Sequence, residues 1–228
     1  MIMVETHCHT GNVSPCGMVD GETIISDYAK AGYGIVITTD HYYQRLWDKK
    51  KSWAENAAFY LSGFRRCLAA GEQMGVKVFL GMEIQFDGDA PHDYLVYGPD
   101  EAFVLSHPYL NEMEPRAFQQ LAAQHGFLMF CAHPYRKGAQ PAEPPFCDGV
   151  EIYNGHPRHF SRNKLALEFA DSYSLMTSSG SDYHMREDVA RGGIMVPDHI
   201  ASMADLVAYL KERRHPELII TFDDKGKR

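Results

Sequence analysis

The chain has 228 residues, of which 45% are hydrophobic and 23% are charged, a composition typical of a globular protein rather than a disordered or fibrous one. Its net charge of −8 argues against binding long nucleic acids through their phosphates, although metal ions could still attract a small anionic substrate. The 5 cysteines are odd in number and form no CxxC pair, which favours a reducing compartment over a disulfide framework. The N-terminus shows no signal-peptide pattern, and no apolar run approaches the roughly 20 residues of a membrane span. We therefore expect a cytoplasmic protein that makes no membrane contact.

In chain order, the sequence predicts strands and helices in alternation. Apolar runs at 1–5 and 34–41 are typical of buried strands, and they flank a helix predicted at 20–32. Further strands are predicted at 76–84, 93–98, 127–134, 149–154, 174–184 and 217–223. Further helices are predicted at 52–75, 115–126, 159–172 and 203–215, and Pro115 and Gly126 bound one of them in the order that helix ends favour.

This alternation indicates parallel strands joined by right-handed crossovers. Seven or eight strands in 228 residues favour a small or distorted (β/α) barrel, with an open doubly wound sheet as the alternative. No repeat or linker interrupts the pattern, so residues 1–228 are interpreted as a single domain. A basic cluster at 45–53 follows a strand end, where barrel enzymes place substrate loops, although a solvated helix start explains it more simply.

Side chains that commonly bind metals stand at the predicted ends of five different strands. In a parallel barrel these strand ends converge on one mouth, so residues far apart in the sequence would meet there. Imidazole and carboxylate together suit Zn, Mn or Fe. One histidine at a strand end is usually an ordinary hydrogen-bonded group, but coincidence explains the whole set poorly. The set comprises His7, His9, His41, Glu83, His133, Asp182 and His184.

Two pairs in this set have i, i+2 spacing. Because alternate residues of a strand point to the same side, His7 and His9 should face the same way, as should Asp182 and His184. Glu5 shares the direction of His7 and could orient a histidine ring from behind. Cys8 should point the opposite way and pack as an apolar residue.

The segments ETHCHT, TTDH, GMEI, AHPYR and GSDYH, in this order, resemble the PHP (polymerase and histidinol phosphatase) domain family of metal-dependent phosphoesterases. The resemblance spans about residues 4–185. It implies a distorted, TIM-like (β/α)7 barrel that holds two or three divalent metal ions (Zn, Mn or Fe).

The resemblance also implies a division of ligands among these metals. One metal would take His7, His9, Glu83 and Asp182; a second would take His41 and His184; and Glu83 would bridge to a third, held also by His133.

The same resemblance leaves two ligand positions open. The family often supplies a further ligand several residues past the first histidine pair, where Cys16 and Asp20 are the nearest candidates. A thiolate there would favour zinc over manganese. A further histidine for the third metal is expected between Glu83 and His133, where His107 stands in a predicted loop or helix.

The chemistry that suits such a cluster is hydrolysis of a phosphate ester by metal-activated water, without a serine or cysteine nucleophile. Arg136, in HPYR, is the candidate phosphate clamp because arginine binds phosphate through two parallel hydrogen bonds. Asn154 and His156 follow a strand end and are candidate substrate contacts. His184, His156 or a water could supply a proton to the leaving alkoxide. The leading hypothesis is an enzyme that acts on a small phosphorylated substrate, a phosphomonoester.

Three other functions fit parts of the pattern. A nuclease of the same family would act on short oligonucleotides or nucleoside bisphosphates. An amidohydrolase would share the HxH pair but would often add a carboxylated lysine at a strand end, where this sequence has none. A non-catalytic metal-binding protein is disfavoured, because structural metal sites tend to be closed.

Overall fold

The computed structural model describes residues 1–89, 91–143 and 145–221. Its strands are β1 (Ile2–Cys8), β2 (Ile35–Thr38), β3 (His41–Tyr42), β4 (Lys77–Ile84), β5 (Tyr94–Tyr97), β6 (Leu128–Cys131), β7 (Gly149–Asn154), β8 (Met176–Gly180), β9 (Gly192–Val196) and β10 (Glu217–Ile220). Its α-helices are α1 (Gly21–Lys30), α2 (Trp53–Met74), α3 (Glu101–Ser106), α4 (Pro115–Gln124), α5 (Asn163–Ser172) and α6 (Met203–Arg213). Short 3-10 turns occur at η1 (Gln44–Leu46), η2 (Leu110–Glu112), η3 (Arg136–Gly138) and η4 (Arg186–Asp188).

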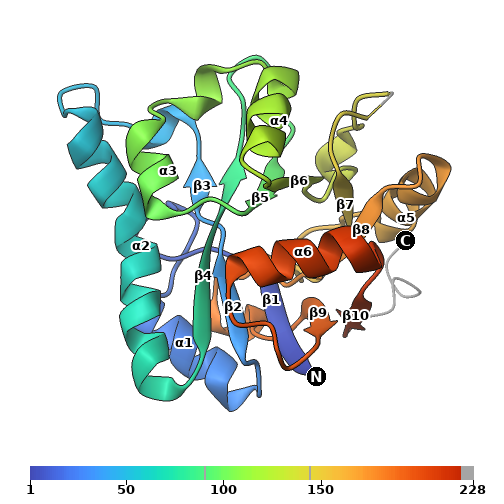
Figure 1. The fold of residues 1–228 in the computed structure, drawn as a ribbon, viewed down its shortest axis with the longest axis horizontal. Helices are drawn as coiled ribbons and strands as arrows, with labels where there is room; N and C mark the ends of the chain where they lie inside the picture. The colour runs from blue at the N-terminus through green and yellow to red at the C-terminus, as the bar shows by residue number, and fades with distance from the viewer. Residues whose placement is uncertain (90, 144, 222–228) are drawn as a thin grey trace.

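The described strands form one strongly curved sheet, seen in Figure 1. Its order is β10-β9-β1-β2-β4-β5-β6-β7-β8, with β3 paired to β4. A single bridge between Cys8 and Tyr183 brings the chain after β8 against β1, so that the sheet nearly closes. The seven strands that run from β1 round to β8 confirm the distorted (β/α)7 barrel.

The expectation of parallel strands throughout is wrong at two places. β5 runs antiparallel to both β4 and β6, and β9 runs antiparallel to β1 and β10. The link 85–93 between β4 and β5 explains the first reversal, because a parallel crossover needs a dozen or more residues.

Most predicted elements appear near their expected positions, but some bounds differ. The strand predicted at 174–184 ends at Gly180, and the helix predicted at 159–172 begins only at Asn163. β9 and α3 were not predicted, since β9 starts on two glycines and α3 has only 6 residues. The last predicted strand is present as β10, and its residues 222 and 223 lie outside the described residues.

Apolar side chains fill the interior of the barrel at one end only. Buried residues of the strands meet α6, which lies across the sheet in Figure 1 and covers the end where the parallel strands begin. These residues include Val4, Ile35, Ile37, Phe79, Leu95, Leu128, Phe130, Met176, Leu206, Val207 and Leu210. The polar side chains are therefore left at the opposite mouth, where the parallel strands finish. None of the helices in the described ranges is both long and apolar enough to cross a membrane.

Candidate metal centre

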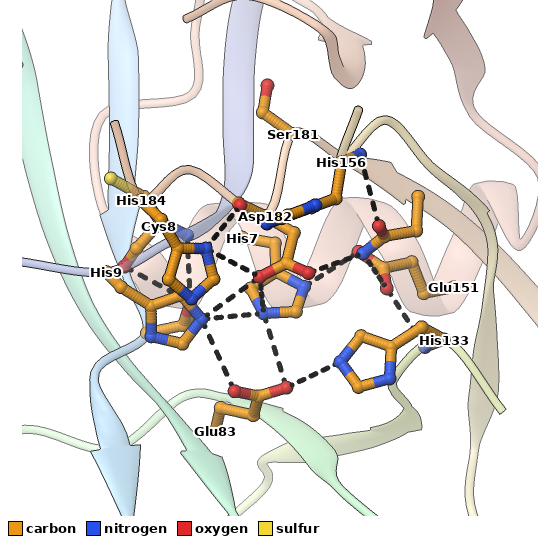
Figure 2. Close-up of polar contacts among 12 residues, drawn as sticks. His7, Cys8, His9, Glu83, His133, Glu151, His156, Ser181, Asp182 and His184 are labelled. Atoms are coloured by element: carbon orange, nitrogen blue, oxygen red, sulfur yellow. Dashed lines mark hydrogen bonds and ion pairs between the residues drawn. The ribbon is translucent and has the colours of Figure 1, made fainter. Parts of the chain in front are cut away.

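The metal-binding side chains predicted at five strand ends lie together at this mouth. Figure 2 shows His7, His9 and His133 pointing toward the carboxylate of Glu83, although the histidines come from the ends of β1 and β6 and the glutamate from β4. His7, His9, Glu83 and Asp182 are almost completely shielded from solvent. We call His7, His9, Glu83 and Asp182 the primary cluster.

The two histidines of the primary cluster lie at ligand spacing from each other and from both carboxylates. His7 Nε2 lies 3.1 Å from His9 Nε2, 3.3 Å from Glu83 Oε1 and 3.4 Å from Asp182 Oδ1. His9 Nε2 lies 3.3 Å from Glu83 Oε2 and 3.3 Å from Asp182 Oδ1. Four ligands around a tetrahedral Zn²⁺ ion lie about 3.4 Å apart, given metal–ligand distances of about 2.1 Å. The residues present therefore fit a divalent metal ion.

The hydrogen bonds behind the two histidines leave lone pairs facing each other. His7 Nδ1 lies 2.9 Å from Glu151 Oε1, and a carboxylate can only accept. His9 Nδ1 lies 3.3 Å from Ser14 Oγ, whose own proton goes to Asp40 Oδ1 at 2.6 Å. In neutral rings both protons thus sit on Nδ1, and two unprotonated Nε2 atoms stand 3.1 Å apart. A cation bound between them would remove this repulsion.

The electrostatics of the primary cluster also favour a cation. Burial disfavours the charged form of His7, but Asp182, Glu151 and Glu83 raise its pKa well above the ordinary value. Burial, His41 and His184 hold the pKa of His9 well below it, so His9 is the neutral ligand form. The negative field that would keep a proton on His7 would equally hold a metal ion in its place.

A second group of donors, the outer cluster, adjoins the first. His9, Cys16, His41 and His184 each offer a donor atom, and these atoms lie within 4.8 Å of one another. Cys16 Sγ is 3.1 Å from His184 Nε2. Burial opposes ionisation of the thiol, yet hydrogen bonds with His184 and His41 lower its pKa to about 7. His41 Nδ1 and Glu83 Oε2 are buried 2.8 Å apart without a well-aligned hydrogen bond, as expected of atoms placed for a metal.

Between the two candidates for the extra ligand position, the structure favours Cys16. Asp20 is exposed and serves as the N-cap of α1, where its side chain accepts a hydrogen bond from the backbone N–H of Thr23 at 2.8 Å. It belongs to none of the groups of donors found among the described residues.

A third group contains a residue that the sequence analysis missed, Asp93. Its carboxylate joins Glu83 and His133 within ligand spacing, and His133 Nε2 lies 2.9 Å from Glu83 Oε1. Because β5 runs antiparallel, its beginning rather than its end lies at the mouth. His107 instead ends α3, where its ring stacks on Phe103, and it joins no group of donors in the described part of the chain.

Glu151 is the second missed residue, and it takes the role expected of Glu5. The Glu5 carboxylate accepts from the backbone N–H groups of Thr6 and His7 and touches neither histidine ring. Glu151, in the middle of β7, supports the His7 ring instead. Cys8 packs in an apolar cluster with Tyr28 and Tyr183, on the other side of β1.

Arg136 lies beside the primary cluster, and two further predicted residues lie behind it. Its Nη2 donates to Asp182 Oδ2 at 2.6 Å and to Asn154 Oδ1 at 2.7 Å. Asn154 and His156 are buried, and burial lowers the pKa of His156 to about 3. Asn154 thus holds the guanidinium in place. Nε of Arg136 has no hydrogen-bond partner among the described residues.

Two site residues have backbone conformations that are uncommon outside glycine. φ is 28° at His133 and 52° at Asp182. Each residue stands two positions after the last residue of a short strand, β6 or β8, and the turn there aims the side chain into the mouth. Such conformations cost free energy and cluster at functional sites.

A cavity of about 270 Å³ opens beside the three groups of donors. It is lined by Arg136, Asp93 and His184, together with Cys16 and Glu83. The volume is below the range of pockets for drug-sized ligands, so it suits a small molecule.

Comparisons with known proteins agree with this architecture. A family model described as PHP-associated matches residues 160–215, which include Asp182 and His184. PsfC from Pseudomonas syringae shares the fold with a TM-score of 0.69 at 14% identity, covering 96% of this chain and 91% of that one. No curated protein sequence matches.

Two further solved structures share the fold. One is a two-domain protein from Bacteroides vulgatus containing a predicted PHP-like metal-dependent phosphoesterase, with a TM-score of 0.61 at 18% identity, covering 85% of this chain and 58% of that one. The other is an amidohydrolase from Chromobacterium violaceum with bound sulfate and no metal, with a TM-score of 0.55 at 14% identity, covering 98% and 99%. At these identities the likeness establishes the fold.

Proposed function

We propose that this chain is a metal-dependent phosphoesterase of the PHP type that hydrolyses a small phosphomonoester; the PHP-associated model that matches residues 160–215 and the fold shared with a PHP-like phosphoesterase support the proposal. The observation that carries the proposal is the primary cluster with Arg136 at its edge. His7, His9, Glu83 and Asp182 would hold one ion, and Cys16, His41 and His184 of the outer cluster would hold a second. Divalent ions bound there would activate water and neutralise the charge of the phosphoryl oxygens.

The protein side of this chemistry begins with Arg136. Its guanidinium lines the cavity, is fixed by Asp182 and Asn154, and keeps Nε free of other partners among the described residues. A phosphoryl oxygen could accept a hydrogen bond from it at little entropic cost, because the side chain is already ordered. Arg136 would therefore orient the phosphoryl group.

The sequence suggested that His184 is both a metal ligand and a proton donor to the leaving alkoxide. The hydrogen bonds of its ring allow only one of these roles at a time. Its Nδ1 donates to the backbone carbonyl of Asp182 at 2.8 Å, which leaves Nε2 as the single available nitrogen. That atom lies 3.1 Å from Cys16 Sγ, in the outer cluster. We assign His184 as a ligand. Since His156 is buried with a low pKa, the leaving alkoxide would take its proton from solvent.

The test is a measurement of metal content and of hydrolysis of an aryl phosphate by the zinc- or manganese-loaded protein. The double variant His7→Ala, Asp182→Ala should lose bound metal and activity together, because it removes two of four ligands. Arg136→Ala should raise KM or lower kcat while the protein retains its metal. His107→Ala is the control, since His107 lies away from the mouth and should change neither quantity.

Full metal content in the double variant would refute the proposed site. If metal and activity are instead lost together, a panel of phosphomonoesters, nucleoside bisphosphates, short oligonucleotides and amides would separate the proposed activity from the nuclease and amidohydrolase alternatives. The acidic net charge of −8 and the small cavity favour the small phosphomonoesters within this panel.

A further inference from the structure

Glu151 is completely buried in β7, and its carboxylate receives hydrogen bonds from three separate donors. Oε1 accepts from His7 Nδ1 at 2.9 Å. Oε2 accepts from the backbone N–H of His133 at 3.0 Å and from Asn154 Nδ2 at 2.9 Å. Figure 2 shows the carboxylate between His7 and His133, on the far side of the His7 ring from His9.

We infer that Glu151 is a positioning residue that sets the tautomer of His7, and thereby the metal affinity of the primary cluster. The inference rests on the proposed metal-dependent function. Because an ionised carboxylate can only accept, Oε1 of Glu151 requires the proton of a neutral His7 ring to sit on Nδ1. Nε2 then keeps its lone pair, and it is Nε2 that faces His9, Glu83 and Asp182.

The donors at Oε2 cannot reverse their roles. The N–H of His133 belongs to the backbone and is always a donor. The amide of Asn154 is held in one orientation, because its Oδ1 accepts from Arg136 Nη2 at 2.7 Å and from the backbone N–H of His156 at 3.2 Å. Only the His7 ring can adapt if the group at position 151 changes.

The substitution Glu151→Gln exploits this asymmetry without changing the size of the side chain. The amide oxygen of glutamine must face the two fixed donors, so its NH₂ group must face His7 Nδ1. The ring would then carry its proton on Nε2, the atom required as a ligand. Loss of such supporting hydrogen bonds typically lowers metal affinity by about 10–100-fold.

Glu5→Gln supplies a matched control, since Glu5 is equally buried and lies on β1, the strand that carries His7. Its Oε1 accepts from backbone N–H groups, which include those of His7 and Ser181. Its Oε2 meets only hydroxyl groups, those of Tyr28 and Ser181. The Tyr28 hydroxyl can rotate to accept from the glutamine NH₂ group, and neither oxygen of Glu5 is hydrogen-bonded to a ring nitrogen of the primary cluster, so this variant should keep the zinc affinity of the wild type.

The experiment is a competition titration with a chromophoric zinc chelator on the wild type and both variants. We expect Glu151→Gln to bind zinc about 10–100-fold more weakly than the wild type, with Glu5→Gln unchanged. If Glu151→Gln and the wild type bind zinc with equal affinity, the inference about Glu151 is overturned but the proposed function is not. Failure of the wild type to bind zinc would overturn the proposed function as well.

A second measurement needs no variant and covers the case in which Glu151→Gln does not fold. Nitrogen-15 NMR of the histidine rings in the zinc-loaded wild type should show His7 with a hydrogen-bonded Nδ1–H and no proton on Nε2. A His7 ring bound to zinc through Nδ1 would overturn the inference.

Discussion

At the residue scale, the chemistry of the site depends on which atom of each side chain is free. His7 and His9 both direct Nε2 inward because Glu151 and Ser14 occupy their Nδ1 atoms. Cys16 is the least usual donor of the site: an exposed thiol whose pKa is lowered to about 7 by its histidine neighbours. Its sulfur would make the outer cluster softer than an all-nitrogen and oxygen site, which favours zinc over manganese there.

We expect cobalt-loaded protein to show a thiolate-to-cobalt charge-transfer band in the near ultraviolet, arising from Cys16. Cys16→Ser should abolish the band, since a hydroxyl group gives no such transition. Cys67→Ser is the control, because Cys67 is buried against Gly21 and lies outside the site. Persistence of the band in Cys16→Ser would show that Cys16 is not a ligand.

At the scale of elements, the close packing of α2 against the mouth supports the site from behind. Gly63 of α2 lies against Thr10 and Asp40, and a Cβ atom there would overlap Thr10 Oγ1 and lie 2.6 Å from Asp40 Oδ2. Asp40 accepts from the backbone N–H of Thr10 at 2.7 Å and from Ser14 Oγ at 2.6 Å. The glycine therefore allows α2 to approach the segment that orients His9 and His41.

Gly63→Ala should destabilise the protein even though alanine is the better helix former. The helical preference would favour alanine by about 1 kcal/mol. Overpacking a buried contact costs about 1–3 kcal/mol, and here it would also disturb the hydrogen bonds of Asp40. Urea denaturation should show a net loss of stability.

Gly88→Ala is the comparison for this measurement. The nearest neighbour of a Cβ atom added at Gly88 would be Glu114 Oε1, at 3.9 Å, so this substitution should be close to neutral. A more stable Gly63→Ala variant would contradict the packing argument.

At the scale of the whole molecule, the primary cluster joins the two edges of the barrel. His7 and His9 lie on or just after β1, and Asp182 lies just after β8, where a single bridge nearly closes the sheet. Glu83 comes from β4, in between. The unfolded chain holds no such site, so metal binding should add its free energy to folding.

Saturating zinc should therefore raise the melting temperature of the metal-free protein. At a free concentration 100 times Kd the gain is about 2.7 kcal/mol, or roughly 5–10 °C for a chain of this size. Differential scanning calorimetry with and without a chelator measures the shift. The same shift in the variant His7→Ala, Asp182→Ala would mean that zinc stabilises the protein elsewhere.

The sequence by itself determined the residue types and their local periodicity. The alternation of strands and helices predicted the barrel, and the histidines and carboxylates at strand ends predicted the residues that meet at the mouth. These properties follow from short stretches of chain, because side-chain chemistry and the direction of alternate residues are local.

Only the tertiary structure decided strand direction and the choice of hydrogen-bond partners. The reversal of β5 brings Asp93 to the mouth, and the near-closure of the sheet between β1 and the chain after β8 brings Glu151 of β7 against the His7 ring. The N-cap role of Asp20 leaves the open ligand position to Cys16. Each of these outcomes depends on contacts between distant parts of the chain, which no local pattern specifies.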